Sequence, residues 1–136
     1  MPDEAQPMSA EAFADRVEEA VLGALDLFSI YLGDRLSYYR HLAERALTPA
    51  ELAERAGTHE RYVREWLEQQ AVTGIVAVED MPGGARRFRL DEGVAEALTD
   101  RRSLSYIAAL ATQVTVAGFH LREIAAAHIG GGGVPG

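Results

Sequence analysis

The chain has 136 residues, of which 48% are hydrophobic and 25% charged, a composition typical of one globular domain. Its formal net charge of −8 disfavours nucleic acid and anionic membranes as partners, because both attract basic proteins. There is no cysteine, which excludes disulfides and thiolate sites, and the acidic N-terminus has no signal-peptide pattern, so we expect a cytoplasmic protein.

The first predicted element is a long helix that follows a disordered tail over residues 1–8. Ser9 is placed to cap it, and apolar residues then recur at helical spacing. A second apolar face in the later half predicts burial on two sides. We expect Gly33 to interrupt the helix and a shorter helix to follow from about Ser37 to Glu44. The two faces comprise Phe13, Val17, Val21, Ala24, Phe28 and Tyr31, and Leu22, Leu25 and Leu32.

Residues 48–73 predict a helix-turn-helix. The run TPAE beginning at Thr48 combines a capping threonine, a proline at the first helical position and a glutamate that completes a capping box. Gly57 supplies a left-handed stop, Thr58 is placed to cap the second helix, and Gly74 ends that helix. The second helix is expected to bury Val63, Trp66, Leu67 and Ala71.

Residues 75–90 predict a β-hairpin. A short β-prone run begins at Ile75, MPGGA forms the turn, and the return strand runs from Arg86 to Leu90 with Phe88 and Leu90 directed inward. Asp91 is placed to cap a small helix that continues through Leu98. A hairpin directly after a helix-turn-helix predicts a mainly α, winged-helix fold.

A long helix is predicted over residues 103–129, with Arg122 and Glu123 as its only formal charges. A small winged helix cannot cover this helix and the N-terminal helix on all sides, so both predict a partner: a second copy, another domain, or both. Residues 9–129 would then form one dimerisation domain, followed by a glycine-rich linker over 130–136. The expected dimer interface comprises Leu25, Phe28, Ile107, Leu110, Val114, Phe119 and Leu121.

No pattern of catalytic, cofactor-binding or metal-ligating residues is found. The four glycines from Gly130 follow a helix, whereas phosphate-binding glycine loops follow a strand and open a helix. The histidines at 41, 59, 120 and 128 do not form a zinc motif, and the last two lie about 12 Å apart along one helix. The paired carboxylates are typical of solvated helix faces.

DNA binding by the helix-turn-helix is the alternative function. A recognition helix requires basic surroundings, yet residues 47–75 contain three arginines and five glutamates. The hairpin is more basic. The candidate DNA contacts are Arg61, Arg64, Arg86, Arg87 and Arg89.

Several runs of sequence resemble a known family. They are FSIYLGDRL from Phe28, LTPAELA from Leu47, THERYVREWLEQQ from Thr58, RFRL from Arg87 and LTD from Leu98. Together they resemble the N-terminal winged-helix domain of actinobacterial two-domain class I S-adenosylmethionine-dependent methyltransferases, over about residues 10–135. The run from Thr58 is the most specific. The chain departs from the family at Ser37-Tyr38-Tyr39, where a Gly-Leu-Tyr-like run is expected.

The resemblance implies that this domain dimerises and helps to cover the substrate pocket of a downstream, Rossmann-like catalytic domain. That domain would bind S-adenosylmethionine through a glycine-rich loop and an acidic residue, which this chain lacks. The chain alone is therefore expected to bind no cofactor and transfer no methyl group. Whether it is a fragment, a truncated product or a free-standing relative stays open.

The resemblance also suggests residues at the rim of a substrate pocket: Tyr31, Asp34, Arg35 and Tyr38. Alternatively, Asp34 and Arg35 form a surface pair and Tyr31 belongs to the core. Trp66 is expected in the core. Three hypotheses follow: a dimerisation and lid domain of a methyltransferase acting on a small molecule, a DNA-binding transcriptional regulator, or a structural interaction domain with no methyltransferase link.

Overall fold

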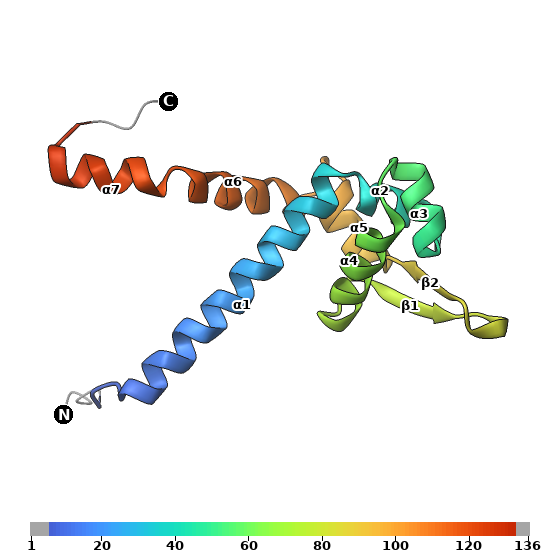
Figure 1. The fold of residues 1–136 in the computed structure, drawn as a ribbon, viewed down its shortest axis with the longest axis horizontal. Helices are drawn as coiled ribbons and strands as arrows, with labels where there is room; N and C mark the ends of the chain where they lie inside the picture. Colours follow the sequence, from blue (N-terminus) through green and yellow to red (C-terminus); the bar gives the residue numbers. More distant parts are fainter. Residues whose placement is uncertain (1–5, 133–136) are drawn as a thin grey trace.

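The computed structural model describes residues 6–132. Two helical arms extend from a body that contains the helix-turn-helix and the hairpin (Figure 1). The first arm is α1 (Ala10–Arg35), and the second consists of α6 (Ala108–Phe119) and α7 (Leu121–Gly130). The mainly α, winged-helix prediction is confirmed. Of the predicted tail, residues 1–5 lie outside the described residues.

Helix α1 begins as expected but does not stop at Gly33. The Ala12 amide donates to Ser9 Oγ at 3.2 Å, which confirms the N-cap. The prediction that Gly33 interrupts the helix is wrong, because α1 continues to Arg35. Close packing accounts for the glycine, since a Cβ there would lie 2.4 Å from Tyr39 Cε2. The chain turns instead at Ser37, whose φ of 61° is left-handed.

The body contains α2 (Tyr38–Glu44), α3 (Pro49–Ala56) and α4 (Glu60–Val72). Thr48 Oγ1 accepts from the Glu51 amide at 3.2 Å, and Gly57 ends α3 with a φ of 68°, as predicted. The prediction that Thr58 caps α4 is wrong. Its hydroxyl accepts from Tyr38 Oη at 2.9 Å, and His59 takes the cap position without a side-chain hydrogen bond.

The hairpin pairs β1 (Ala77–Asp80) with β2 (Arg86–Arg89) in antiparallel register, with Val78 opposite Phe88. A 3-10 turn, η1 (Pro82–Gly84), joins the strands, and Leu47 exchanges two backbone hydrogen bonds with Phe88. This bridge ties the hairpin to the start of the helix-turn-helix. Phe88 and Leu90 are buried, as predicted, and the small helix α5 (Glu92–Thr99) follows.

The core lies entirely in the body and the roots of the arms. Val63, Trp66 and Leu67 of α4 are buried as expected, whereas Ala71 is only half-buried. Gln70 is also fully buried, which the hydrophobic pattern does not predict. The other core side chains are Tyr38, Tyr39, Leu42, Leu47, Leu52, Ala53, Val76, Phe88, Leu90, Leu98 and Ala108.

The prediction of one helix over residues 103–129 is wrong at its start and in its middle. The Ile107 amide donates to Ala97 O at 2.9 Å, which holds residues 103–107 in turns against α5. Helix α6 ends at His120, whose φ of −100° and ψ of 5° interrupt the helix before α7. Gly118 and several β-branched residues make this segment a weak helix former. Among residues 6–132, no helix could cross a membrane.

The expected linker over 130–136 is described only in part. Gly130 is the last residue of α7, and Gly131 ends this helix with a φ of 70°. Residues 133–136 lie outside the described part of the chain.

Candidate functional site

Helix α1 presents an exposed apolar stripe, formed by Val17, Val21, Leu25, Phe28 and Leu32. These residues follow one another at intervals of three or four, so they lie on one face of the helix. Each is between 46% and 51% exposed. Within one chain, α1 is therefore not buried on two sides as the sequence predicted, because only its C-terminal part packs against α2 and α6.

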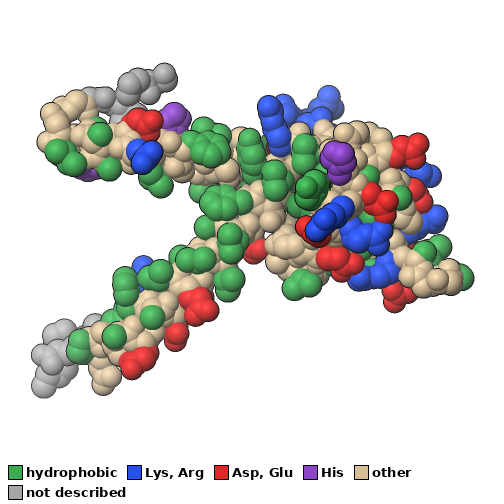
Figure 2. Space-filling model, viewed as in Figure 1, with side chains coloured by type: hydrophobic (Ala, Val, Ile, Leu, Met, Phe, Trp, Pro, Cys, Tyr) green, Lys and Arg blue, Asp and Glu red, His purple; other side chains and the backbone are tan. Residues whose placement is uncertain are grey.

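A second apolar stripe, formed by Ile107, Leu110, Val114 and Leu121, follows α6 into α7. The neighbouring face of α6 carries Ala108 and Ala111, which are buried because α6 packs chiefly against α1. The second stripe thus lies beside the contact between the two arms and is exposed. Figure 2 shows hydrophobic side chains along both arms, whereas the arginines concentrate on the body. Both stripes are available to a partner.

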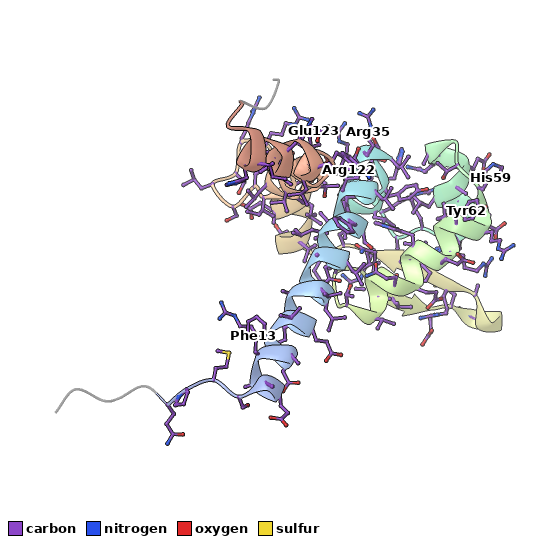
Figure 3. All side chains as sticks on the ribbon, turned by 60° about the vertical axis from the view of Figure 1, so that its left-hand side comes forward. Phe13, Arg35, His59, Tyr62, Arg122 and Glu123 are labelled. Atoms are coloured by element: carbon purple, nitrogen blue, oxygen red, sulfur yellow. The ribbon has the colours of Figure 1, made fainter. Side chains whose placement is uncertain are left out.

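The exposed apolar residues extend to the free ends of both arms. Phe13 lies near the start of α1, and Arg122 and Glu123 lie on α7, far from Tyr62 on the body (Figure 3). Phe119, at the end of α6, is 70% exposed. All seven residues of the predicted dimer interface are therefore at the surface, and their role in a dimer stays a prediction.

A groove of about 580 Å³ lies beside the α1 stripe, between α1 and the end of α4. Leu25, Phe28 and Leu32 form much of its wall. Its other lining residues are Leu22, Asp26, Ser29, Gln69 and Thr73. A hollow of this size and apolar character suits inserted side chains of another polypeptide.

The five arginines proposed as DNA contacts all form ion pairs. Arg64 pairs with Glu60 one turn away, and Arg61 Nε lies 3.5 Å from Glu65 Oε1. Arg86 Nη1, from the hairpin, lies 2.6 Å from Glu68 Oε1 on α4.

The remaining two arginines lie on β2. Arg87 Nη2 is 3.7 Å from Glu51 Oε1, and Arg89 contacts both Glu79 and Asp91. The hydrogen bond to Asp91 raises the pKa of Arg89. These glutamates and aspartates neutralise the surface that a winged helix presents to DNA.

A small hollow of about 220 Å³ opens between the start of α3, the exposed face of α4 and the hairpin turn. Its charged residues are Glu60, Arg64, Glu68 and Arg86, which are paired with one another. The Arg86 guanidinium also lies over the Phe88 ring, 5.4 Å from its centroid. The hollow therefore offers no free charge to a ligand.

The four predicted rim residues differ in their exposure. Tyr38 is buried, with its ring centroid 4.9 Å from that of Trp66. Tyr31 is half-buried, and Arg35 is exposed at the body end of α1 (Figure 3). Asp34 lines a hollow of about 380 Å³ that also contains Arg101, Tyr106, Ala109, Thr112 and Gln113. The rim assignment stays a prediction, and Asp34 has the most favourable position for it.

The sequence analysis missed the junction that anchors α1 to the body. The Trp66 indole donates from Nε1 to Ser29 O at 3.0 Å, and Tyr39 Oη donates to Gln70 Oε1 in the interior. Burial, followed by the nearby Asp34 and Asp26 carboxylates, raises the pKa of Tyr39 above its usual range. The signal in the sequence was a glycine within an apolar helix, followed closely by aromatic residues.

Residues 24–100 match the family model of the Rv2258c-like winged HTH domain, which is more than half of the chain. The chain belongs to this family. The match covers the later part of α1, the helix-turn-helix, the hairpin and α5. No curated protein sequence matches the chain.

Three solved structures are similar to this winged HTH domain. Human N-acetylserotonin methyltransferase, in complex with SAM, is 17% identical over 73% of the chain, with a TM-score of 0.57. PigF, with SAH, is 16% identical over 80%, with a TM-score of 0.59. CalO1, a methyltransferase in calicheamicin biosynthesis in its SAH-bound form, is 26% identical over 71%, with a TM-score of 0.50.

The chain spans less than a third of each of these proteins, namely 28%, 29% and 27% of their lengths. The matched part is their N-terminal region. The resemblance to the N-terminal winged-helix domain of two-domain methyltransferases is confirmed.

Proposed function

We propose that this winged HTH domain is the dimerisation and lid module of an S-adenosylmethionine-dependent methyltransferase that acts on a small molecule. In this proposal the chain transfers no methyl group by itself, and a downstream domain supplies the cofactor site. The observation that carries the proposal is the pair of apolar stripes on a fold shared with methyltransferase N-terminal regions.

The stripes support assembly because contiguous exposed apolar surface of this extent is rare on monomeric proteins and marks interaction sites. Both stripes lie on helices, which can pack face to face. The body has its own hydrophobic core, and no residue of either stripe belongs to it. We therefore assign the stripes to a homodimer.

The lid role is supported by the position of Asp34 beside the root of both arms. The hollow there combines a carboxylate, the Arg101 guanidinium, the Tyr106 ring and the Gln113 amide. These groups suit a small polar substrate that a catalytic domain holds from the other side. Asp34 is the residue through which this domain would contact the methyl acceptor.

DNA binding is the second candidate function, and the helix-turn-helix with its arginine-bearing hairpin favours it. Such a function would require the arginines on α4 and β2 to contact phosphates or bases. Their pairing with carboxylates weakens this candidate, because each phosphate contact would first break an ion pair. Similar folds serve unrelated functions, so the fold alone does not decide.

The proposal is tested by light scattering over a range of protein concentrations, combined with a mobility-shift assay on mixed-sequence duplex DNA. We expect a dimer and no DNA shift at low salt. Calorimetry with S-adenosylhomocysteine should give no binding to this chain. A monomer would remove the dimerisation role, and salt-sensitive DNA binding would favour the regulator.

A further inference from the structure

We infer that the hollow between α1 and α6 binds the methyl acceptor through two opposite charges, and that this acceptor is a small organic acid that also carries a hydroxyl or amino group. Arg101 binds the acid group, and Asp34 accepts a hydrogen bond from the hydroxyl or amino group. The inference rests on the proposed lid function and specifies the class of substrate.

The hollow is formed within one chain. Its volume is about 380 Å³, which suits a small molecule. Helix α6 contributes Ala109, Thr112 and Gln113 to the wall, and Tyr106 lines it just before this helix begins. Asp34 lines it from the C-terminal end of α1. Because α6 packs chiefly against α1, the shape of the hollow does not require a second copy.

The two charges of this hollow are not paired. Within residues 6–132, every ion pair involves other residues, so Asp34 and Arg101 do not come within ion-pair distance of each other. The hollow beside the hairpin differs, because its charges pair with one another. A ligand between α1 and α6 can therefore bind both charges without first breaking an ion pair.

The surroundings favour an anion at Arg101. Arg35 follows Asp34 and extends outward from the end of α1 (Figure 3), and Arg102 follows Arg101. In the described part of the chain, neither Arg35 nor Arg102 forms an ion pair. Three guanidinium groups thus accompany the carboxylate that lines the hollow, although the whole chain has a net charge of −8. Arginine binds a carboxylate or phosphate through two parallel N–H donors.

The loop over residues 101–106 is held in place by hydrogen bonds of its own. The Arg102 amide donates to Asp100 Oδ1 at 3.0 Å. The Ser103 hydroxyl donates to Glu96 Oε1 at 2.7 Å. Both carboxylates therefore bond to the loop itself, and the backbone that carries Arg101 is fixed before a ligand arrives. A site formed in advance loses less entropy on binding.

Asp34 requires a hydrogen-bond donor on the ligand. The residue is half-buried near the C-terminus of α1, where the helix dipole adds negative potential. A carboxylate accepts hydrogen bonds, so Asp34 disfavours a second acid group and favours a hydroxyl or a protonated amino group. The Tyr106 ring and Ala109 add apolar surface, which suits the carbon skeleton of the ligand.

The test measures the binding of meta- and para-hydroxybenzoate to this chain by two-dimensional NMR at constant ionic strength. The two acids place the carboxylate and the hydroxyl at different separations. Their neutral amides and benzoate, which lacks the hydroxyl, are the matched probes. We expect the better acid to shift the amide signals of Thr112 and Gln113 and to bind about tenfold more tightly than its amide or benzoate. No shift with either acid, or equal binding of acid and amide, would overturn the inference.

Three variants assign the binding to the two charges. Arg101→Gln should weaken binding of the better acid about tenfold, and Asp34→Ala should abolish its advantage over benzoate. Arg102→Gln is the matched control, because it removes the same charge from a neighbouring residue that does not line the hollow, and it should weaken binding less than about twofold. Equal losses in Arg101→Gln and Arg102→Gln would reduce the effect to general attraction and overturn the assignment.

The result is separable from the proposed dimerisation, since the probes bind within one chain and no methyl transfer is required. A dimer by light scattering that binds neither acid would overturn this inference alone. A monomer that binds the acids with the expected variant pattern would overturn the dimerisation role and support the assignment of the hollow.

Discussion

Gly33 and Trp66 touch so closely that a Cβ on the glycine would lie 2.5 Å from Cζ2 of the indole. The same Trp66 donates a hydrogen bond to Ser29 O, one turn earlier in α1. The two contacts fix the angle at which α1 leaves the body. The orientation of the α1 stripe therefore depends on a junction outside the stripe.

Replacing Gly33 by alanine is expected to destabilise the protein by about 2 kcal/mol, because overpacking against buried rings outweighs the better helix propensity of alanine. Urea unfolding at fixed protein concentration measures the change. Gly23→Ala is the matched control, since nothing lies within 4 Å of a Cβ there. The control should gain up to about 1 kcal/mol. Equal effects at both positions would contradict the packing argument.

The hydrogen bond from Tyr39 to Gln70 is expected to show strong coupling. Tyr39→Phe leaves the buried Gln70 carbonyl without this donor and should cost about 1–3 kcal/mol. Adding Gln70→Leu removes the unsatisfied group, so the double variant should cost less than the sum of the single variants. Urea unfolding of the unmodified protein, the two single variants and the double variant gives the coupling free energy between the two side chains. Strict additivity of the three changes in unfolding free energy would argue against a buried hydrogen bond. Tyr62→Phe, at an exposed site, is the control.

The raised pKa of Tyr39 also predicts a pH dependence. The unfolded chain loses this proton near pH 10 and the folded protein only at higher pH, so stability is fully present below about pH 10. Above it, stability should fall by about 1.4 kcal/mol per pH unit until the folded-state pKa is reached. Unfolding at pH 9, 10 and 11 measures the slope, and Tyr39→Phe should flatten it. An unchanged slope in that variant would assign the effect to other groups.

Removing three carboxylates from the exposed face of α4 should allow the domain to bind DNA weakly. The triple variant Glu60→Gln, Glu65→Gln and Glu68→Gln frees Arg61, Arg64 and Arg86. Exposed ion pairs contribute about 0–1 kcal/mol each, so stability should change little. A mobility shift should appear at low salt and disappear as salt rises. Strong DNA binding by the unmodified chain would contradict the argument that ion pairs with glutamates keep these arginines from contacting DNA.

A charge in the middle of the α6–α7 stripe should dissociate the dimer. Val114→Glu buries an unpaired carboxylate, which at about 3 kcal/mol corresponds to roughly 100-fold weaker association. Gln113→Glu adds the same charge at the neighbouring exposed position and should have little effect. Sedimentation equilibrium compares the two. Equal association constants would exclude this stripe from the interface.

The body could be predicted well from the sequence because local signals and tertiary packing agree there. Thr48, Pro49 and Gly57 mark the ends of α3, and the alternation around Phe88 marks a strand with one buried face. The winged helix then follows from the order of these elements. The prediction that Thr58 caps α4 was wrong because its hydroxyl had two possible partners, the backbone of α4 and the distant Tyr38. It bonds to Tyr38.

The arms were harder to predict because periodicity reports which residues avoid water, not what covers them. Gly33 has the same appearance in the sequence whether it breaks a helix or admits an aromatic ring. The interruption at His120 leaves the apolar pattern intact on both sides, so one helix was expected. The ion pair between Arg86 of β2 and Glu68 of α4 could not be predicted from the sequence, because the two residues are far apart along the chain and only the folded structure brings them together.

The first half of α1 is exposed along its whole circumference, from Ala10 to Gly23. An isolated helical segment of this length is only marginally stable in water. Its helicity should therefore rise with protein concentration, and its amide protons should be protected from exchange only when the chain associates. Folding of this arm and binding of its partner would then be one cooperative event. The segment that determines the specificity of association would become structured only when it binds.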